Sequence, residues 1–151
     1  MNVKIEDILK RKGNKVLTVT RNVLLDEAVH IMTSNKIGAL VVANDGVLEG
    51  IITERDVLHA LDKRGFDAIS KLKVEDLMTA EVHTGTPDDD IVYVMTIMSK
   101  NHFRHMPVIN EDGGKLVGLV SSKDVVTAAL AAESMENRIL KHYIKNWPEE
   151  E

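Results

Sequence analysis

Hydrophobic positions recur with helical spacing in two separate parts of the chain. Leu25, Ala28, Val29 and Met32 fall at i, i+3, i+4 and i+7, which is one apolar stripe of an amphipathic helix. The stripe returns 66 positions later (91 − 25 = 66), at Ile91, Val94, Met95 and Met98. This echo indicates an internal duplication.

Unbroken apolar runs predict buried strands after each of these helices. Residues 38–43 and 50–52 carry no polar interruption, as expected of strands covered on both faces. Gly-containing turns at 44–46 and 110–114 predict β-hairpins. The second turn is two residues longer, so the offset becomes 68 (118 − 50 = 68). Each unit is therefore predicted as extended segment, helix, strand, hairpin, strand, helix.

A short motif closes each unit. Gly50-Ile51-Ile52-Thr53-Glu54-Arg55-Asp56 returns as Gly118-Leu119-Val120-Ser121-Ser122-Lys123-Asp124. Thr/Ser-x-x-Asp before an apolar run is the pattern of a capping box. The same strand-to-helix junction presents unpaired N–H groups and the positive end of the helix dipole, which suit a phosphate. A single copy of the motif would favour simple capping. Two copies in matching contexts also allow the interpretation that the motif forms a binding site.

The remaining segments complete the predicted organisation. The fold class is α/β (α+β), with two repeats, each a small sheet flanked by two helices, packed with pseudo-twofold symmetry because one unit alone buries too little surface. The first helix of the second unit is expected to start at Thr86, with Pro87 in its first turn. An apolar stripe that includes Trp147 predicts a tail helix, which we expect to cover a partner subunit rather than its own chain. The predicted division is 1–65 for repeat one with its lead-in, 66–73 for a linker, 74–131 for repeat two and 132–151 for the tail.

Composition excludes several classes of protein. The 151 residues are 44% hydrophobic and 28% charged, which is ordinary for a globular protein. A net charge of −5 and 3% aromatics argue against a nucleic-acid binder. No apolar run approaches the roughly 18 residues of a membrane helix, and the N-terminus lacks the apolar core of a signal peptide. We therefore expect a cytoplasmic protein without membrane or nucleic-acid partners.

The sequence offers no catalytic or metal constellation. There is no cysteine, P-loop, Gly-x-Ser-x-Gly or His-Glu-x-x-His. The acids at 88–90 are interpreted as partners of a helix dipole rather than metal ligands. His102 and His105 flank a predicted strand and are expected on opposite faces of it. We expect neither an enzyme nor a metal site.

What the sequence does contain suits a nucleotide. Each motif holds a cation, Arg55 or Lys123, and Arg104-His105 beside the second unit's first strand adds two candidate phosphate donors. Asp56 or Asp124 can accept hydrogen bonds from ribose hydroxyls, and the neighbouring apolar segments can sandwich a flat heterocycle. The positions that match Arg104-His105 in unit one are 38–39, Gly-Ala, so the two sites are not expected to be equivalent.

These residues resemble a tandem pair of cystathionine β-synthase (CBS) domains, or Bateman module, of the free-standing single-pair kind. The resemblance runs from about residue 5 to about residue 130. It rests on the two closing motifs and on three segments: Ile-Gly-Ala-Leu-Val-Val at 37–42, Val-Glu-Asp-Leu-Met-Thr at 74–79 and Arg-His-Met-Pro-Val-Ile at 104–109.

The resemblance implies a regulatory module that forms homodimers, acts on an unidentified partner protein and binds an adenosine ligand between its repeats. AMP is the first choice, followed by ATP, ADP or NAD, and no catalytic cofactor is implied. The implied ribose and sugar contacts are Thr53 with Asp56 in one site and Ser121 with Asp124 in the other. The other implied ligand-binding residues are Thr18 and Thr84 near the bases, Arg55, Arg104, His105 and Lys123 near phosphate, and the adjoining Met106 and Pro107.

Two departures from the family pattern bear on the sites. Arg21 stands where proline is common, and Gly85 replaces an aliphatic residue, which is expected to loosen one base pocket. The second motif, with Arg104 and His105 available, is expected to be the better-formed site. Asp124→Ala is then expected to abolish most binding, and Asp56→Ala to leave it. The alternative is a ligand-independent interaction scaffold whose motifs act only as helix caps.

Overall fold

The computed structural model describes residues 3–132 together with residues 142 and 145. The predicted tail helix at 132–151 therefore lies almost wholly outside the described residues. Within the described part of the chain, no helix is long and apolar enough to span a membrane.

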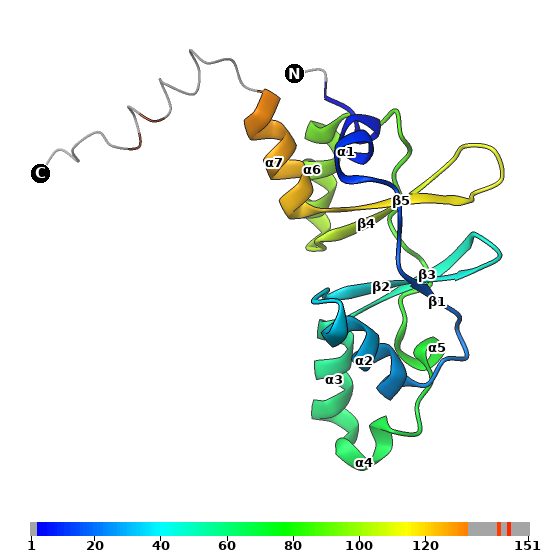
Figure 1. The fold of residues 1–151 in the computed structure, drawn as a ribbon. Coiled ribbons are helices and arrows are strands. Elements are labelled where there is room, and N and C mark those ends of the chain that lie inside the picture. Colours follow the sequence, from blue (N-terminus) through cyan, green and yellow to red (C-terminus); the bar gives the residue numbers. More distant parts are fainter. Residues whose placement is uncertain (1–2, 133–141, 143–144, 146–151) are drawn as a thin grey trace, which may run out of the picture.

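Each repeat consists of a small sheet with helices on one face (Figure 1). Repeat one contains β1 (Thr18–Val19), α2 (Leu25–Ser34), β2 (Ala39–Asn44), β3 (Val47–Thr53) and α3 (Glu54–Arg64). Repeat two contains α6 (Ile91–Asn101), β4 (His105–Ile109), β5 (Leu116–Ser121) and α7 (Ser122–Ala132). Three further helices are α1 (Ile5–Lys12), α4 (Phe66–Ile69) and α5 (Val74–Leu77). This architecture confirms the predicted fold class.

The two sheets are built alike. In repeat one β1 pairs parallel to β2, and β2 pairs antiparallel to β3. In repeat two β4 pairs antiparallel to β5, and a single parallel bridge from Gly85 to Val108 stands where β1 stands in repeat one. The extended segment predicted before α6 is thus reduced to one bridge.

The start of α6 differs from the prediction. The helix begins at Ile91, and the Asp90 side chain caps it by accepting from the Val92 N–H at 2.7 Å. Thr86 belongs to a separate turn, in which its N–H donates to Asp89 at 2.8 Å. The reason is tertiary, because the carbonyls of Pro87 and Asp89 accept hydrogen bonds from the first turn of α1.

The two lead-in helices are exchanged between the repeats. Ile5 and Ile8 of α1 are buried in the core of repeat two, whereas Val74 of α5 is fully buried in the core of repeat one. Figure 1 shows the two crossing segments, one descending from α1 to β1 and the other ascending from α5 towards α6. Each sequence repeat therefore completes its core with a helix from the other repeat.

Residues of β2 are buried on both faces of their sheet. Leu40 and Val42 join the core under the helices of repeat one, while Val41 is fully buried on the alternate face. That face lies towards the other sheet (Figure 1). The Leu116 N–H donates to the Gly46 carbonyl at 2.8 Å, which ties the two hairpin turns together.

The motif glycines allow the crossing segments to approach closely. A Cβ at Gly118 would lie 2.6 Å from Leu9 Cδ2 of α1, and a Cβ at Gly50 would lie 2.8 Å from the backbone oxygen of Thr79. Cβ atoms essentially never come so near another heavy atom. Where a lead-in from one repeat crosses a strand of the other, a side chain at position 50 would meet backbone, and a side chain at position 118 would force the Leu9 side chain to move.

We expect Gly118→Ala to lower the free energy of unfolding by about 1–3 kcal/mol, the usual cost of overpacking. In a Leu9→Ala background, which vacates the colliding side chain, the same substitution should cost close to nothing. Urea denaturation of the four proteins of this cycle measures the difference. An equal cost in both backgrounds would contradict the close approach of α1.

Candidate functional site

A large cavity of about 390 Å³ lies between the repeats. Three segments form most of its wall: the junction of β3 with α3, the crossing segment at 79–83, and the turn from α6 into β4 at 101–105. Its volume falls within the roughly 300–1,000 Å³ typical of small-molecule pockets. Its polar lining includes Thr53, Glu54, Arg55, Asp56, Glu81, His83, Asn101, His102, Arg104 and His105.

The first motif presents its carboxylate at the edge of this cavity. Thr53 caps α3, and Asp56 Oδ2 accepts from the Thr53 N–H at 2.8 Å and from Thr53 Oγ1 at 3.1 Å. Within the described part of the chain both hydrogen bonds accepted by Asp56 end on Oδ2. Capping therefore fixes the carboxylate in place and leaves Oδ1 to accept from a ligand.

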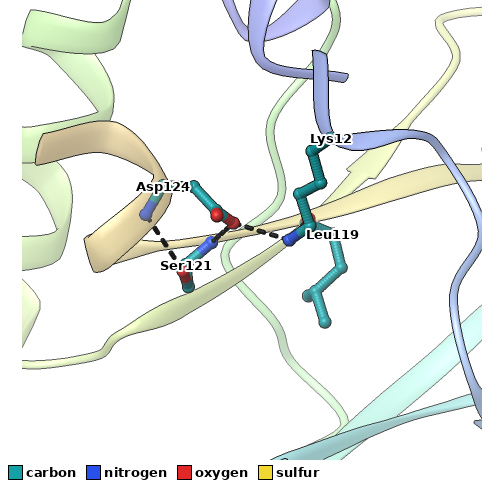
Figure 2. A network of polar contacts seen from close by, with 4 residues as sticks. All are labelled: Lys12, Leu119, Ser121 and Asp124. Carbon is teal, nitrogen blue, oxygen red and sulfur yellow. Dashed lines mark hydrogen bonds and ion pairs between the residues drawn. The ribbon is translucent and has the colours of Figure 1, made fainter. Parts of the chain in front are cut away.

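The second motif repeats the cap but carries an additional cation. Asp124 Oδ2 accepts from the Ser121 N–H at 2.9 Å, and Ser121 Oγ accepts from the Asp124 N–H at 3.1 Å. Figure 2 shows the Lys12 ammonium reaching the same carboxylate, with Nζ 2.6 Å from Oδ2 and 2.8 Å from the Leu119 carbonyl oxygen. The second carboxylate is thus already paired.

The ionisation of Asp124 reflects this pairing. Burial on its own would raise the pKa of the carboxyl group. The hydrogen bonds from Lys12 and from the Ser121 backbone outweigh burial and hold the pKa of Asp124 below its ordinary value. Asp124 is therefore a carboxylate at neutral pH.

Arg104 and His105 do not serve the second motif alone, as the sequence suggested. Both line the large cavity together with Thr53 and Asp56 of the first motif. The cavity beside Asp124 is only about 100 Å³ and lies towards α1 and α7. Which motif forms the better site stays a prediction, but Lys12 pairs with the carboxylate of the second motif and the volume of about 390 Å³ adjoins Asp56.

The surroundings of His105 shift the pKa of its imidazole. Burial lowers its pKa below the ordinary value, and the cations of Lys12 and Arg104 act in the same direction. The carboxylates of Glu54 and Asp124 oppose these effects without cancelling them. His105 is therefore mainly neutral near pH 7, ready to gain a proton when an anion approaches.

Several other predicted site residues line no part of the large cavity. Thr18 is exposed on β1 and Thr84 is half-buried, and neither residue lines the cavity. Met106 is fully buried in the core of repeat two, and Pro107 is buried within β4. Lys123 is exposed and adjoins the small cavity by α1. The structure thus gathers Thr53, Arg55, Asp56, Arg104 and His105 at one place and keeps Ser121, Lys123 and Asp124 at another.

Gly85 does not loosen a pocket, contrary to the prediction. A Cβ there would lie 2.8 Å from Ile5 Cδ1 and 2.9 Å from Met106 Sδ. The exchanged helix α1 fills the space that an aliphatic side chain would take. Arg21, the other departure, forms an ion pair with Glu49 at 3.2 Å.

Sequence reasoning missed the contribution of the crossing segments. Glu81 lines the large cavity and Lys12 pairs with Asp124, yet neither lies in a motif. The available signal is that residues 5–9 resemble residues 74–78 at an offset of 69 (74 − 5 = 69), which marks both lead-ins as part of the duplication. It also missed the stacked rings of His83 and Phe103, whose centroids lie 5.0 Å apart at the cavity wall.

The two histidines at 102 and 105 also differ from expectation. His102 ends α6 in a left-handed conformation (φ 58°) instead of preceding a strand in extended form. Both residues line the same cavity. Among the described residues, no three His, Cys, Asp or Glu side chains lie close enough together to hold a metal ion.

Comparison with known proteins assigns the repeats to one family. A family model described as the CBS domain matches residues 5–63 and again residues 74–131. A relative from Arabidopsis thaliana, the CBS domain-containing protein CBSX3, is 38% identical over 150 residues, which are 93% of this chain and 71% of the relative. That relative is described as mitochondrial, and a cytoplasmic location for this chain stays a prediction.

Two solved structures with the same fold hold adenosine compounds. The CBS domain pair of protein MJ0100, in complex with 5′-methylthioadenosine and S-adenosyl-L-methionine, has a TM-score of 0.75 and 28% identity, and the match covers 88% of this chain and all of that one (100%). CBSX2 in complex with AMP has a TM-score of 0.71 and 27% identity, with 85% and 96% covered.

The lowered pKa of His105 predicts a pH-dependent stability. Because the folded state favours the neutral ring, stability is full above the unfolded pKa of about 6.5 and falls as the unfolded chain takes up a proton below it. Acidification from about pH 7.5 to 5.5 should thus destabilise the wild type more than His105→Gln. Urea denaturation at both pH values measures this, and an equal loss in the two proteins would contradict it.

Proposed function

This chain belongs to the CBS domain family, and we propose that it is a regulatory sensor that binds an adenosine nucleotide, AMP in the first place, between its two repeats. The observation that carries the proposal is the composition of the 390 Å³ cavity. The junction of β3 with α3 supplies a capped carboxylate, the turn from α6 into β4 supplies a guanidinium and an imidazole, and a stacked aromatic pair lines the same cavity. These groups match ribose, phosphate and base.

Asp56 is the proposed ribose ligand. Its Oδ2 is held by Thr53, which leaves Oδ1 to accept a hydroxyl hydrogen bond. Asp56 forms no ion pair within the described part of the chain, so a ligand need not displace a cation to reach it. The site is preorganised because the helix cap already fixes the carboxylate.

Arg104 and His105 are the proposed phosphate ligands. Arg104 is exposed at the cavity, and its planar guanidinium can donate two parallel hydrogen bonds to phosphate oxygens. A phosphate beside His105 favours the protonated ring and adds a second charge-assisted bond. The N-terminus of α3, which adjoins the same cavity, also favours an anion.

Charge in the cavity favours a monophosphate. Glu54 and Glu81 line it together with the two arginines and the histidines. Each phosphate added to the chain of a ligand increases the repulsion from these carboxylates. AMP is therefore proposed before ATP and ADP, while the flat base can pack on the His83–Phe103 pair.

The alternative of a ligand-free scaffold also has an observation in its favour, because both motifs do act as helix caps. Capping and binding are compatible, however, since the cap of Asp56 uses one carboxylate oxygen. The cavity at Asp56 is an observation that a cap alone does not require.

Self-association remains part of the proposal and is supported by one apolar surface. Val92 and Tyr93 of α6 and Val126 of α7 are 46%, 53% and 49% exposed. The positions that match 92 and 93 in repeat one are Asp26 and Glu27 (92 − 66 = 26). Repeat two thus presents the apolar helix face that a second copy of the chain would cover.

We expect AMP to bind and to raise the melting temperature, because a ligand of the folded state stabilises it. Arg104→Gln should weaken AMP binding by about 10–100-fold, the value of a charge-assisted hydrogen bond, and leave adenosine binding almost unchanged. Asp56→Asn should weaken both ligands. Calorimetric titration measures all of these affinities.

Two matched controls separate binding from stability. Lys100→Gln removes a positive charge near the end of α6 outside the cavity, and Asp89→Asn alters a comparable hydrogen bond to a backbone N–H, 2.8 Å long. Neither should change the affinity for AMP. No binding of AMP, ATP, ADP, NAD or S-adenosylmethionine to the wild type would favour the scaffold instead.

Tyr93→Glu is expected to shift the chain from dimer to monomer, because it places a charge on the apolar face of α6. Sedimentation velocity measures the change, with Glu27→Gln at the matching position of α2 as the control. A wild-type monomer at micromolar concentration would remove self-association from the proposal.

A further inference from the structure

We propose that Lys12 acts as a resident occupant of the second motif and closes it to nucleotides, so that each chain binds one nucleotide rather than two. The inference rests on the proposed function, because it states which of the two duplicated sites is open. It assigns a role in ligand selection to a residue that lies in neither motif.

Lys12 pairs directly with the carboxylate that the second motif would offer to a ligand. Its ammonium lies 2.6 Å from Asp124 Oδ2 and 2.8 Å from the Leu119 carbonyl oxygen (Figure 2). Lys12 and the Ser121 N–H both contact Oδ2, so a ribose that approached Oδ1 would meet a carboxylate whose charge the ammonium already neutralises. The Asp124 side chain is 23% exposed and Lys12 38%, so the pair is partly shielded from water.

Lys12 is carried by a helix whose position is fixed. It is the last residue of α1, which is anchored by the buried side chains of Ile5 and Ile8. Leu9 of the same helix lies against Gly118 so closely that a Cβ there would collide with it. Gly13 then ends the helix with φ 93°. The base of the Lys12 side chain is thus held beside the second motif by the packing of the whole helix.

The first motif lacks this feature at the matching place. The lead-ins match at an offset of 69 over residues 5–9 and 74–78, but α1 continues to Lys12 whereas α5 ends at Leu77, so α5 carries no residue in the place of Lys12. Glu81 lines the large cavity, and a carboxylate cannot pair with Asp56. The equivalent cavities along α3 with α5 and along α7 with α1 also differ, with about 320 Å³ beside Asp56 and about 100 Å³ beside Asp124, where Lys12 is part of the lining.

The test counts bound AMP per chain by calorimetry. The wild type should bind one equivalent. Lys12→Met, which keeps the length of the side chain but removes its charge, should bind two. The second equivalent should disappear again in Lys12→Met with Asp124→Asn. Conversely, Glu81→Lys should supply the missing cation to the first motif and weaken AMP binding there by at least tenfold.

The matched control is Lys10→Met, which removes an exposed charge from the same helix turn without touching Asp124. It should leave one equivalent. Two equivalents in the wild type, or one in Lys12→Met, would overturn the inference. If the wild type binds no AMP, the proposed function fails. The role of Lys12 is then still tested. Binding of AMP by Lys12→Met would support the blocking role, and no binding by this variant would refute it.

Discussion

The structure depends on the exchange of lead-in helices between the repeats. Neither repeat has a complete core of its own, because Ile5 and Ile8 are buried in repeat two and Val74 in repeat one. A segment that must leave one core and enter the other has to cross the opposing sheet. The glycines at 50 and 118 stand at these crossings, where any side chain would collide. The first residue of each motif is thus explained by packing before any ligand is considered.

The same crossings decide what the two sites contain. The strand-to-helix junctions are nearly equivalent, since the residue after each cap donates its N–H to a matching carbonyl, Glu54 to Gly38 at 3.0 Å and Ser122 to Arg104 at 2.8 Å. The segment brought against each junction is not equivalent, because one supplies Lys12 and the other Glu81. The two strand-to-helix junctions are therefore alike in both repeats, and the two sites differ because different segments pack against them.

The repeat, the order of elements and the caps could all be predicted from the sequence, since each depends on local spacing. The apolar stripes of α2 and α6 and the Thr53–Asp56 cap are examples. The features that could not be predicted depend on tertiary contacts. The helix α6 begins later than predicted because the carbonyls of Pro87 and Asp89 accept hydrogen bonds from the backbone of α1. The side chain of Ile5 fills the space beside Gly85. Both follow from a helix crossing to the other repeat, which no local pattern encodes.

The same reasoning explains why the motif is both a cap and a candidate site. A free aspartate on a loop would lose side-chain entropy on binding a ribose. Asp56 has already lost it, because the Thr53 N–H and hydroxyl hold one of its oxygens. The crossing segment that faces Asp56 also pairs with β3, since the Ile51 and Thr79 backbones exchange hydrogen bonds of 3.0 and 2.9 Å. A ligand in this cavity would therefore contact groups whose positions are set by both repeats at once. That dependence is what a sensor requires, because any change in how the repeats pack changes the affinity, and by linkage the ligand changes the packing.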